Sequence, residues 1–563
     1  MSKQYPFFTS PYFSTFRLTQ NIIMKVLLFL LAPLFTLVVS AQQIPTDYLT
    51  ADFHKGRRDA FRAEMPANSV AVLFSNPVRN RANDVDYIYH QDPDFHYLTG
   101  YNEPHAVLLI FSSPQTTPDG NTYNELIFVQ ERNARAEQWN GRRLGVAGTI
   151  ATLGFESAYN GSEFAALDIN FKSFDKVMFY NFNNDIRDTR EGADLFDLVK
   201  SFKNKIGFPS NYNASRMQVY ALIQSAPVEE TDKIMTLLDR YAKMDPSLIE
   251  DPFIKDFIAA AKSGTDQKIL DRAKTAVNVA LNQYNFDLDG LNRIMSGLRE
   301  TKLPEEMALL RKAIEVSAVG QLEVMKAMHP NMSETEVQGV HEYVYKKYGA
   351  EYEGYPSIVG GGNNGCILHY IENNKPELGE DLVLMDLGAE YHGYTADVTR
   401  TIPANGVFSP EQKAIYEIVY NAQEAGIAAS VVGAPFSAPG AAASKVVAQG
   451  LISLGLIKEA SEARKYFPHG TSHYLGLDVH DKGTYGPFKA NTVITVEPGI
   501  YIPEGSDCDP KWWGIAVRIE DDILISDQGP VLLSYMAPRS VAAIEAAMKL
   551  PSPLDAFSLP TLE

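Results

Sequence analysis

Three histidines lie within twelve residues of one another towards the C-terminal end of the sequence. They are His469, His473 and His480, whereas the whole chain of 563 residues holds 11 histidines. An imidazole can ligate a metal ion, shuttle a proton or hydrogen-bond a carbonyl oxygen. Glycines at positions 470 and 476 allow close backbone approach and sharp turns. The segment therefore indicates a chemical site, and it leaves open which histidine does what.

Two aspartates belong to a predicted β-hairpin upstream of these histidines. Asp386 interrupts the apolar run at residues 382–385, and Asp397 follows on the predicted return strand. A two-residue loop at 391–392 places the two aspartates directly opposite each other, with Cβ atoms about 5 Å apart. Opposed like charges destabilise a sheet unless something neutralises them, and a divalent cation would do so. The alternative is an ordinary hairpin with two solvated acids.

Two glutamates add carboxylates on the strands that follow. Glu497 ends a β-branched strand immediately before a Pro-Gly turn, and Glu520 is two residues after Arg518, so that these two side chains share one face of a strand. Taken singly, each acid could be a surface residue or a salt-bridge partner. With one histidine, the four acids form a donor set that suits a pair of Mn²⁺, Co²⁺, Fe²⁺ or Zn²⁺ ions better than a structural zinc site. Such an ion pair can polarise a carbonyl, which is a hydrolase arrangement.

The composition excludes several classes of protein. Apolar residues make up 45% and charged residues 21% of the chain, which excludes a disordered, a collagen-like and a polytopic membrane protein. The net charge of −19 repels phosphate backbones, so no nucleic-acid partner is expected. The two cysteines, Cys366 and Cys508, exclude a disulfide-rich scaffold, and we expect both to be free thiols.

The N-terminal segment has the pattern of a cleavable secretory signal. An apolar run of 14 residues at 26–39 follows Lys25 and ends in small residues at Ala41. The run is short for a hydrocarbon core of ~30 Å, so an uncleaved membrane anchor is the weaker alternative. We therefore expect residues 1–41 to be removed and Gln42 to begin the mature chain. The mature protein is then expected to be exported, periplasmic or secreted, and not attached to a membrane.

Two domains are predicted to position the site. Residues 42–300 read as a mixed α/β domain, with short buried strands at 69–74 and 106–111. A helical section near 205–295 closes this domain, because apolar and charged residues alternate there at helical spacing.

The second predicted domain covers residues 301–545 and carries the site. A helix is expected to begin at Pro304, since proline is favoured at the first helical position. From Tyr355 onward, strands are expected to dominate. Residues 546–563 are expected to form a tail.

The motifs resemble those of the pita-bread metallopeptidases (M24B), most closely their aminopeptidase P branch. The similarity covers residues 50–200 and 297–540, and the helical section is longer than in the short bacterial members. The matching stretches are residues 79–80, 89–104 and 138–145 of the N-terminal half and residues 385–388, 395–400, 469–481, 495–501 and 517–522 of the C-terminal half.

This resemblance implies a role for each candidate residue. Two divalent ions per subunit, with manganese expected, would be held by Asp386, Asp397, His473, Glu497 and Glu520. The catalytic side chains would be Glu497 for proton transfer, His480 for the tetrahedral intermediate and His369 for the substrate carbonyl. The residues that line the proline pocket or brace the site would be His469, Tyr485, Tyr501 and Arg518. Asp94 would be an acid of the N-terminal domain near the substrate amine, and Trp139 would be lent to the site of a neighbouring subunit.

The implied protein is a homodimer or homotetramer of subunits with an N-terminal α/β domain and a C-terminal pita-bread domain. Its implied activity is hydrolysis of the N-terminal Xaa–Pro bond of peptides with proline second. A prolidase, which cuts only Xaa–Pro dipeptides, is an alternative on the same fold. A metal-free binding protein is another, although such relatives usually lose ligands. A methionine aminopeptidase would not need the N-terminal domain, the complete metal set disfavours a creatinase-like hydrolase, and nothing repetitive supports a structural role.

Overall fold

The computed structural model describes residues 47–116, 120–182, 193–225, 227, 230–262, 267–556 and 559. The elements below all belong to one compact unit, Leu49–Glu563. The predicted signal segment, residues 1–41, lies outside the described residues. Among the described residues, no helix is long and apolar enough to cross a membrane.

A mixed sheet forms the centre of the N-terminal part. Its strands are β1 (Ser69–Phe74), β4 (Val107–Thr116), β5 (Thr122–Val129), β6 (Ala158–Asn160), β7 (Lys176–Phe179) and β8 (Phe286–Asp287). They lie in the order β6-β5-β4-β1-β7-β8, with β1 antiparallel to β4 and parallel to β7. The strand predicted at 69–74 is confirmed, and the strand predicted at 106–111 begins one residue later and is longer.

Both faces of this sheet are buried. Val70 and Val72 of β1 pack into one apolar cluster, whereas Ala71 and Leu73 pack into another on the opposite face. A small exposed pair, β2 (Asn80–Ala82) and β3 (Val85–Asp86), lies outside the sheet. The helices of this part are α2 (Ala51–Glu64), α3 (Pro93–Thr99), α4 (Ala134–Asn140), α5 (Gly145–Leu153) and α6 (Leu195–Ile206).

The helical section has an apolar core of its own, in which Val219, Leu238 and Phe257 are buried. Its helices are α7 (Ala214–Ser225), α8 (Thr231–Met244), α9 (Pro252–Lys262) and α10 (Gln267–Leu281). The chain then returns to the first sheet as β8 before α11 (Gly290–Glu300). The all-helical prediction missed this return, because a strand of two residues has no periodicity to detect.

The second part begins with the predicted helix at Pro304. Proline occupies the first turn of α12 (Pro304–Ala327), and the backbone N–H of Leu303 donates to Glu306 Oε2 at 2.9 Å. Leu310 and Ile314 are fully buried on its inner side. The next helix, α13 (Glu334–Tyr348), begins at the N-cap Ser333.

Short antiparallel sheets carry the residues of the candidate site. Their strands are β9 (Tyr352–Glu353), β10 (Ile358–Gly361), β11 (Leu382–Leu387), β12 (Ala389–Tyr391), β13 (Tyr394–Thr395), β14 (Val398–Pro403), β15 (Thr492–Val496), β16 (Gly499–Ile502), β17 (Ile515–Arg518), β18 (Asp521–Ser526) and β19 (Gly529–Leu532). The sheets have the orders β10-β11-β14, β13-β12-β9, β15-β18-β19 and β16-β17.

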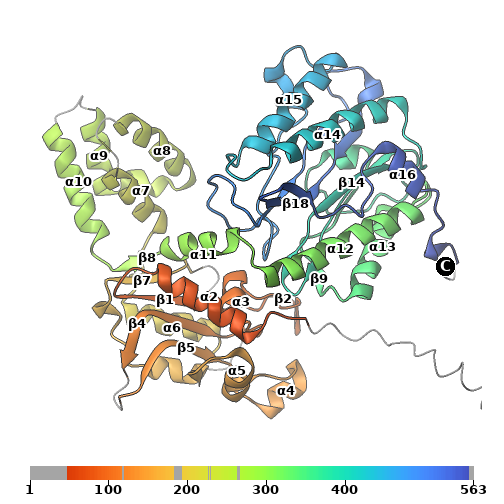
Figure 1. The fold of residues 1–563 in the computed structure, drawn as a ribbon. Helices are drawn as coiled ribbons and strands as arrows, with labels where there is room; N and C mark the ends of the chain where they lie inside the picture. The colour runs from red at the N-terminus through yellow and green to blue at the C-terminus, as the bar shows by residue number, and fades with distance from the viewer. Residues whose placement is uncertain are drawn as a thin grey trace, which may run out of the picture. The chain divides into compact units, whose positions relative to one another are not determined.

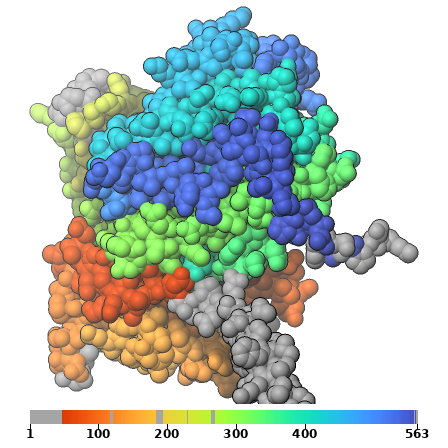
Figure 2. Space-filling model, turned by 45° about the vertical axis from the view of Figure 1, so that its right-hand side comes forward, coloured from red at the N-terminus to blue at the C-terminus, as the bar shows by residue number. Residues whose placement is uncertain are grey.

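Strands do not dominate after Tyr355 as predicted, because long helices also lie there. These are α14 (Pro410–Ala429), α15 (Ala438–Ser453) and α16 (Val541–Ala547). Figure 1 shows α14 and α15 running side by side. α16 packs against α12, and Figure 2 shows blue C-terminal atoms directly against green atoms.

The hairpin that carries the two aspartates has a different loop from the predicted one. Tyr391 pairs with Tyr394, so the loop is His392–Gly393, with φ values of 51° and 86°. Both central residues of a type I′ turn need positive φ, and glycine at the second position meets that need. Asp386 therefore pairs with Thr399, and the prediction that it directly opposes Asp397 is wrong. A shift of two residues keeps the alternation of faces, so both carboxylates still reach the same site.

At Gly388 the two strands of this hairpin lie too close together for a side chain. A Cβ built on it would lie 2.0 Å from Ala396 O and 2.6 Å from Tyr355 Cε1. We expect Gly388→Ala to destabilise the protein by at least ~2 kcal/mol, since a backbone oxygen cannot move aside. Gly339→Ala is the matched control. Gly339 is exposed on α13, and a Cβ built on it would meet open space. Thermal unfolding should show a lower Tm for Gly388→Ala only. An unchanged Tm would contradict this account of the hairpin.

Candidate metal centre and active site

Three carboxylates surround one nitrogen of His473. Its Nε2 lies 3.4 Å from Asp397 Oδ2, 3.7 Å from Glu497 Oε1 and 3.9 Å from Glu520 Oε1. Asp397 precedes β14, Glu497 follows β15 and Glu520 lies between β17 and β18. Ligand atoms of Asp397, His473 and Glu520 all lie within 4.8 Å of one another. These side chains therefore surround a volume suited to a metal ion.

Tyr355 joins Asp386 to this group. Its hydroxyl oxygen lies 2.6 Å from Oδ1 of Asp386 and 2.6 Å from Oδ1 of Asp397. Arg518 donates from Nη2 to the other oxygen of Asp386 at 2.6 Å. Burial and the two carboxylates raise the pKa of Tyr355 well above its usual range, so it remains a hydrogen-bond donor. All five predicted ligands thus converge, although the predicted hairpin register was wrong.

The backbone around His473 directs its Nε2 towards the acids. The N–H of His473 donates to Thr495 Oγ1 at 3.2 Å, and Thr495 N–H donates back to His473 O at 3.0 Å. Nδ1 lies 3.0 Å from Tyr474 O, which leaves Nε2 free to act as a ligand. Among the five residues, His473 stands outside the strands and their ends. It lies in an irregular segment that is held against β15.

The carboxylates have little positive charge to balance them. Among the described residues, their ion-pair partners are Arg518 and histidines only. Burial raises the pKa of Glu497 to about 7, and burial with the facing Asp386 raises that of Asp397. Such a donor set, oxygen-rich with one imidazole and short of cations, fits divalent metal ions.

The charges of this cluster predict how the stability of the metal-free protein depends on pH. Burial raises the pKa of Glu497 to about 7, so loss of its proton destabilises the folded protein. His473 has a pKa raised to about 9, since Asp397 and Glu497 outweigh its burial, and its stabilising charge is lost as the pH rises through that value. Both effects have the same sign. We therefore expect the metal-free protein to lose stability between pH 6 and about 9.

Metal binding should have the opposite pH dependence, because ions bind the deprotonated ligands. The increase in Tm caused by Mn²⁺ over EDTA should grow as the pH rises. Differential scanning calorimetry at a series of pH values measures this increase. A constant increase across the series would contradict the proposed coupling between protons and metal.

A second chain of polar contacts runs beside the carboxylates. His469 Nε2 lies 2.8 Å from the hydroxyl of Tyr501, to which Arg518 donates from Nη1 at 3.0 Å. His469 Nδ1 is 3.6 Å from Glu497 Oε2. Burial, Arg518 and His369 lower the pKa of His469 to about 4. The structure thus brings three of the predicted substrate-pocket residues to the same site.

The two predicted catalytic histidines also lie at this site. The ring of His480 lies 4.2 Å from that of His473, measured between centroids. Burial, followed by His473, lowers the pKa of His480, and His369 adds to the same effect. Both His369 and His480 are exposed. A neutral imidazole keeps one N–H, so His480 can donate a hydrogen bond to a bound peptide.

Three predicted residues lie elsewhere. Tyr485 is 62% exposed and packs against Phe436 and Tyr474. Trp139 is 82% exposed on α4. Asp94 is buried in a separate group of charges. Among the described contacts, none joins these three side chains to the five ligands, so their predicted roles stay predictions.

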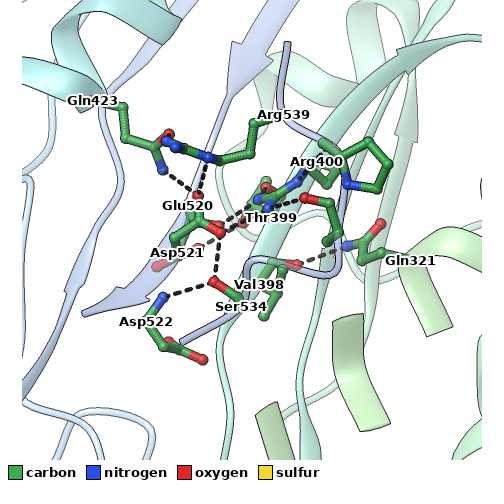
Figure 3. A network of polar contacts seen from close by, with 12 residues as sticks. Gln321, Val398, Thr399, Arg400, Gln423, Glu520, Asp521, Asp522, Ser534 and Arg539 are labelled. Carbon is green, nitrogen blue, oxygen red and sulfur yellow. Dashed lines mark hydrogen bonds and ion pairs between the residues drawn. The ribbon is translucent and has the colours of Figure 1, made fainter. Parts of the chain in front are cut away.

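Behind Glu520 lies a network of buried polar contacts (Figure 3). Thr399 donates from Oγ1 to Glu520 Oε2 at 2.6 Å, and Arg400 donates from Nη1 to the Glu520 carbonyl at 2.7 Å. Arg400 Nη2 also donates to Asp521 at 2.7 Å. The sequence prediction missed the roles of Tyr355, Thr399 and Arg400. Thr399 and Arg400 stand within the matching stretch at residues 395–400, whereas no sequence pattern distinguishes Tyr355 from other tyrosines.

The comparisons with known proteins agree in both halves of the chain. The profile of "Metallopeptidase family M24" matches residues 308–527, and that of "Aminopeptidase P, N-terminal domain" matches residues 54–172. The Xaa-Pro aminopeptidase of Haemophilus influenzae is 32% identical over 504 residues, covering 87% of this chain and 96% of the relative. That of Escherichia coli is 31% identical, with the same two coverages. The structure of E. coli aminopeptidase P with the inhibitor Pro-Leu has a TM-score of 0.67 at 30% identity, covering 89% of this chain and 98% of that one.

Proposed function

This chain belongs to the Xaa-Pro aminopeptidases of metallopeptidase family M24, and we propose that Asp386, Asp397, His473, Glu497 and Glu520 hold the two ions on which its activity depends. It is a metalloaminopeptidase with an aminopeptidase P-type N-terminal domain and a C-terminal pita-bread domain. It hydrolyses the N-terminal Xaa–Pro bond of peptides. The convergence of three acids, Asp397, Glu497 and Glu520, on His473 is the observation that carries the proposal. Asp386 joins this group through the hydroxyl of Tyr355.

Glu497 is the proposed proton carrier. When bound, two divalent ions supply Lewis acidity for the scissile carbonyl and make a hydroxide nucleophile available at neutral pH. Glu497 accepts the proton of the attacking water and delivers it to the leaving prolyl nitrogen. Its place among the ligands supports this role, because Glu497 lies beside the position where the attacking water would be activated. His469 lies beside this carboxylate, with its Nδ1 3.6 Å from Glu497 Oε2.

The exposed histidines are proposed to bind the reacting carbonyl group. His480 donates a hydrogen bond to the oxygen that becomes negative in the tetrahedral intermediate, and His369 binds a substrate carbonyl. The contact between His480 and His473 supports this role, because it places the His480 imidazole directly beside one of the proposed ligands, with ring centroids 4.2 Å apart. The lowered pKa of His480 leaves it neutral, so that it does not repel the bound ions.

Proline selectivity is proposed to arise from the shape of the pocket. Proline lacks a backbone N–H, and its ring fixes φ, so the enzyme cannot recognise it as one more extended residue. The chain of contacts from His469 through Tyr501 to Arg518 supports a rigid wall beside the ligands. Tyr485 and Trp139 keep their proposed roles from the family resemblance only.

Manganese is the proposed metal, because carboxylate-rich sites with one imidazole suit it. After reconstitution with Mn²⁺, elemental analysis should give about two ions per chain, as expected for a two-metal hydrolase. His473→Ala should lower that number, whereas the exposed His329→Ala should not. An unchanged metal content in His473→Ala would contradict the ligand assignment.

Export and self-association complete the proposal. The apolar run at residues 26–39 supports a signal segment, so the exported protein should begin at Gln42. N-terminal sequencing of the protein from a periplasmic or secreted fraction tests this. Light scattering of the same sample should give the mass of a homodimer or homotetramer.

A further inference from the structure

We propose that Arg299 is a positioning residue for the reaction, because it holds the loop that carries His480. The inference rests on the proposed role of His480. It concerns a buried group of charges that lies outside the five ligands and is built by Arg299, Asp94, Asp478 and Asp481.

His480 has little to hold it in place by itself. It is exposed and lies in an irregular loop between Gly476 and Gly483. Its ring contacts His473, and among the described residues no hydrogen bond to its ring nitrogens is found. The position of its imidazole therefore depends on the backbone of the loop.

Arg299 binds both acidic residues that flank this histidine. It donates from Nη2 to Asp478 Oδ2 at 2.7 Å and to Asp481, which comes directly after His480. Lys302 donates from Nζ to the other oxygen of Asp481 at 2.8 Å. The side chains of Arg299, Lys302 and Asp481 are each 1% exposed. One guanidinium thus fixes the loop on both sides of His480.

Asp94, in the N-terminal part of the chain, is the last member of this group. We call Arg299 with Asp94, Asp478 and Asp481 the clamp. Asp94 Oδ1 accepts from Arg299 Nη1 at 2.7 Å, and its Oδ2 accepts from Lys482 Nζ at 2.6 Å and from the hydroxyl of Tyr180. Lys482 is two residues after His480. Both oxygens of Asp94 are therefore used in holding the loop. This assigns Asp94 an indirect role, different from the contact with the substrate amine that the family resemblance implies.

The geometry of the guanidinium is what Arg299 contributes. Its planar fork of donors bridges three carboxylates, whereas a lysine ammonium at the end of a flexible stem cannot reproduce that spacing. A displacement of about 1 Å in a catalytic group can lower a rate ~10²-fold. Arg299→Lys should therefore lower kcat ~10- to 100-fold, with KM and bound metal nearly unchanged.

A double-mutant cycle tests whether Arg299 acts through His480. The four proteins are the wild type, Arg299→Lys, His480→Ala and the double variant, each assayed with Mn²⁺ and an Xaa-Pro-Pro tripeptide. If Arg299 acts by positioning His480, its replacement should change kcat less than ~3-fold once His480 is absent. An equal loss in both backgrounds would overturn the inference. An inactive wild type would instead refute the proposed function.

Arg58→Lys is the matched control for the loss of a buried arginine. Arg58 is 0% exposed and donates to Glu125 at 2.9 Å, away from the loop. This variant should lower Tm and leave kcat unchanged.

A milder variant keeps the inference testable if Arg299→Lys fails to fold. The side chain of Asp478 is 43% exposed, so Asp478→Asn removes one contact of the clamp with little risk to folding. It should lower kcat ~3- to 10-fold in the wild-type background, from a smaller displacement of the loop, and should have no effect in His480→Ala. A wild-type kcat in Asp478→Asn, or an equal loss with and without His480, would refute the clamp.

Discussion

Replacement of Glu497 by glutamine is expected to lower kcat for an Xaa-Pro-Pro tripeptide by at least ~10³-fold, near the upper range for loss of a general base. Glutamine has the shape of glutamate but cannot accept the proton of the attacking water. The Glu497 side chain is 18% exposed and lies beside His469 and His473. The other described acids at this site are themselves proposed ligands, so none of them can replace Glu497 without leaving its own position.

Because Glu497 is also a proposed ligand, the assay needs a metal analysis beside it. Manganese content measured on the same preparation separates loss of the base from loss of an ion. Glu504→Gln is the control, since Glu504 is exposed seven residues further along the chain. Turnover like that of the wild type in Glu497→Gln would defeat the assignment of this residue.

Removal of His480 is expected to lower kcat by ~10² to 10³-fold, the loss typical of one oxyanion donor. His480→Ala should retain both ions, because the ring of His480 contacts a proposed ligand, His473, without being one itself. KM should change little, since the hydrogen bond forms with charge that develops in the transition state. Steady-state kinetics with elemental analysis measure both quantities.

His329→Ala is the control for histidine removal, because His329 is exposed at the end of α12. A loss of metal in His480→Ala would show that this histidine acts as a ligand. A rise in KM with normal kcat would show that it binds the substrate in its ground state.

The donor set could be predicted from sequence because metal ligands require particular residue types. Asp386 stands out in an apolar strand, and Glu497 stands out before a Pro-Gly turn. The direction of His473 could not be predicted, since hydrogen bonds to Thr495 and Tyr474 set it.

The hairpin register and the supporting residues needed the folded structure. Either of two adjacent dipeptides could have formed the loop, and the choice of His392–Gly393 moved the partner of Asp386 by two residues. Tyr355 contacts an aspartate 31 residues away, and Thr399 contacts a glutamate 121 residues away. Contacts at such separations arise from tertiary packing and have no local pattern. Asp94 is a further case, because its partners come from α11 and the His480 loop.

The central claim is that a metal-dependent centre cleaves the first bond of peptides with proline second. Hydrolysis of Arg-Pro-Pro and Gly-Pro, measured side by side with Mn²⁺ and with EDTA, tests it most directly. The account predicts manganese-dependent release of arginine from the tripeptide, little cleavage of the dipeptide and no cleavage in EDTA. Preference for Gly-Pro would make the protein a prolidase. Cleavage of neither peptide, by a protein that binds no metal, would contradict the account.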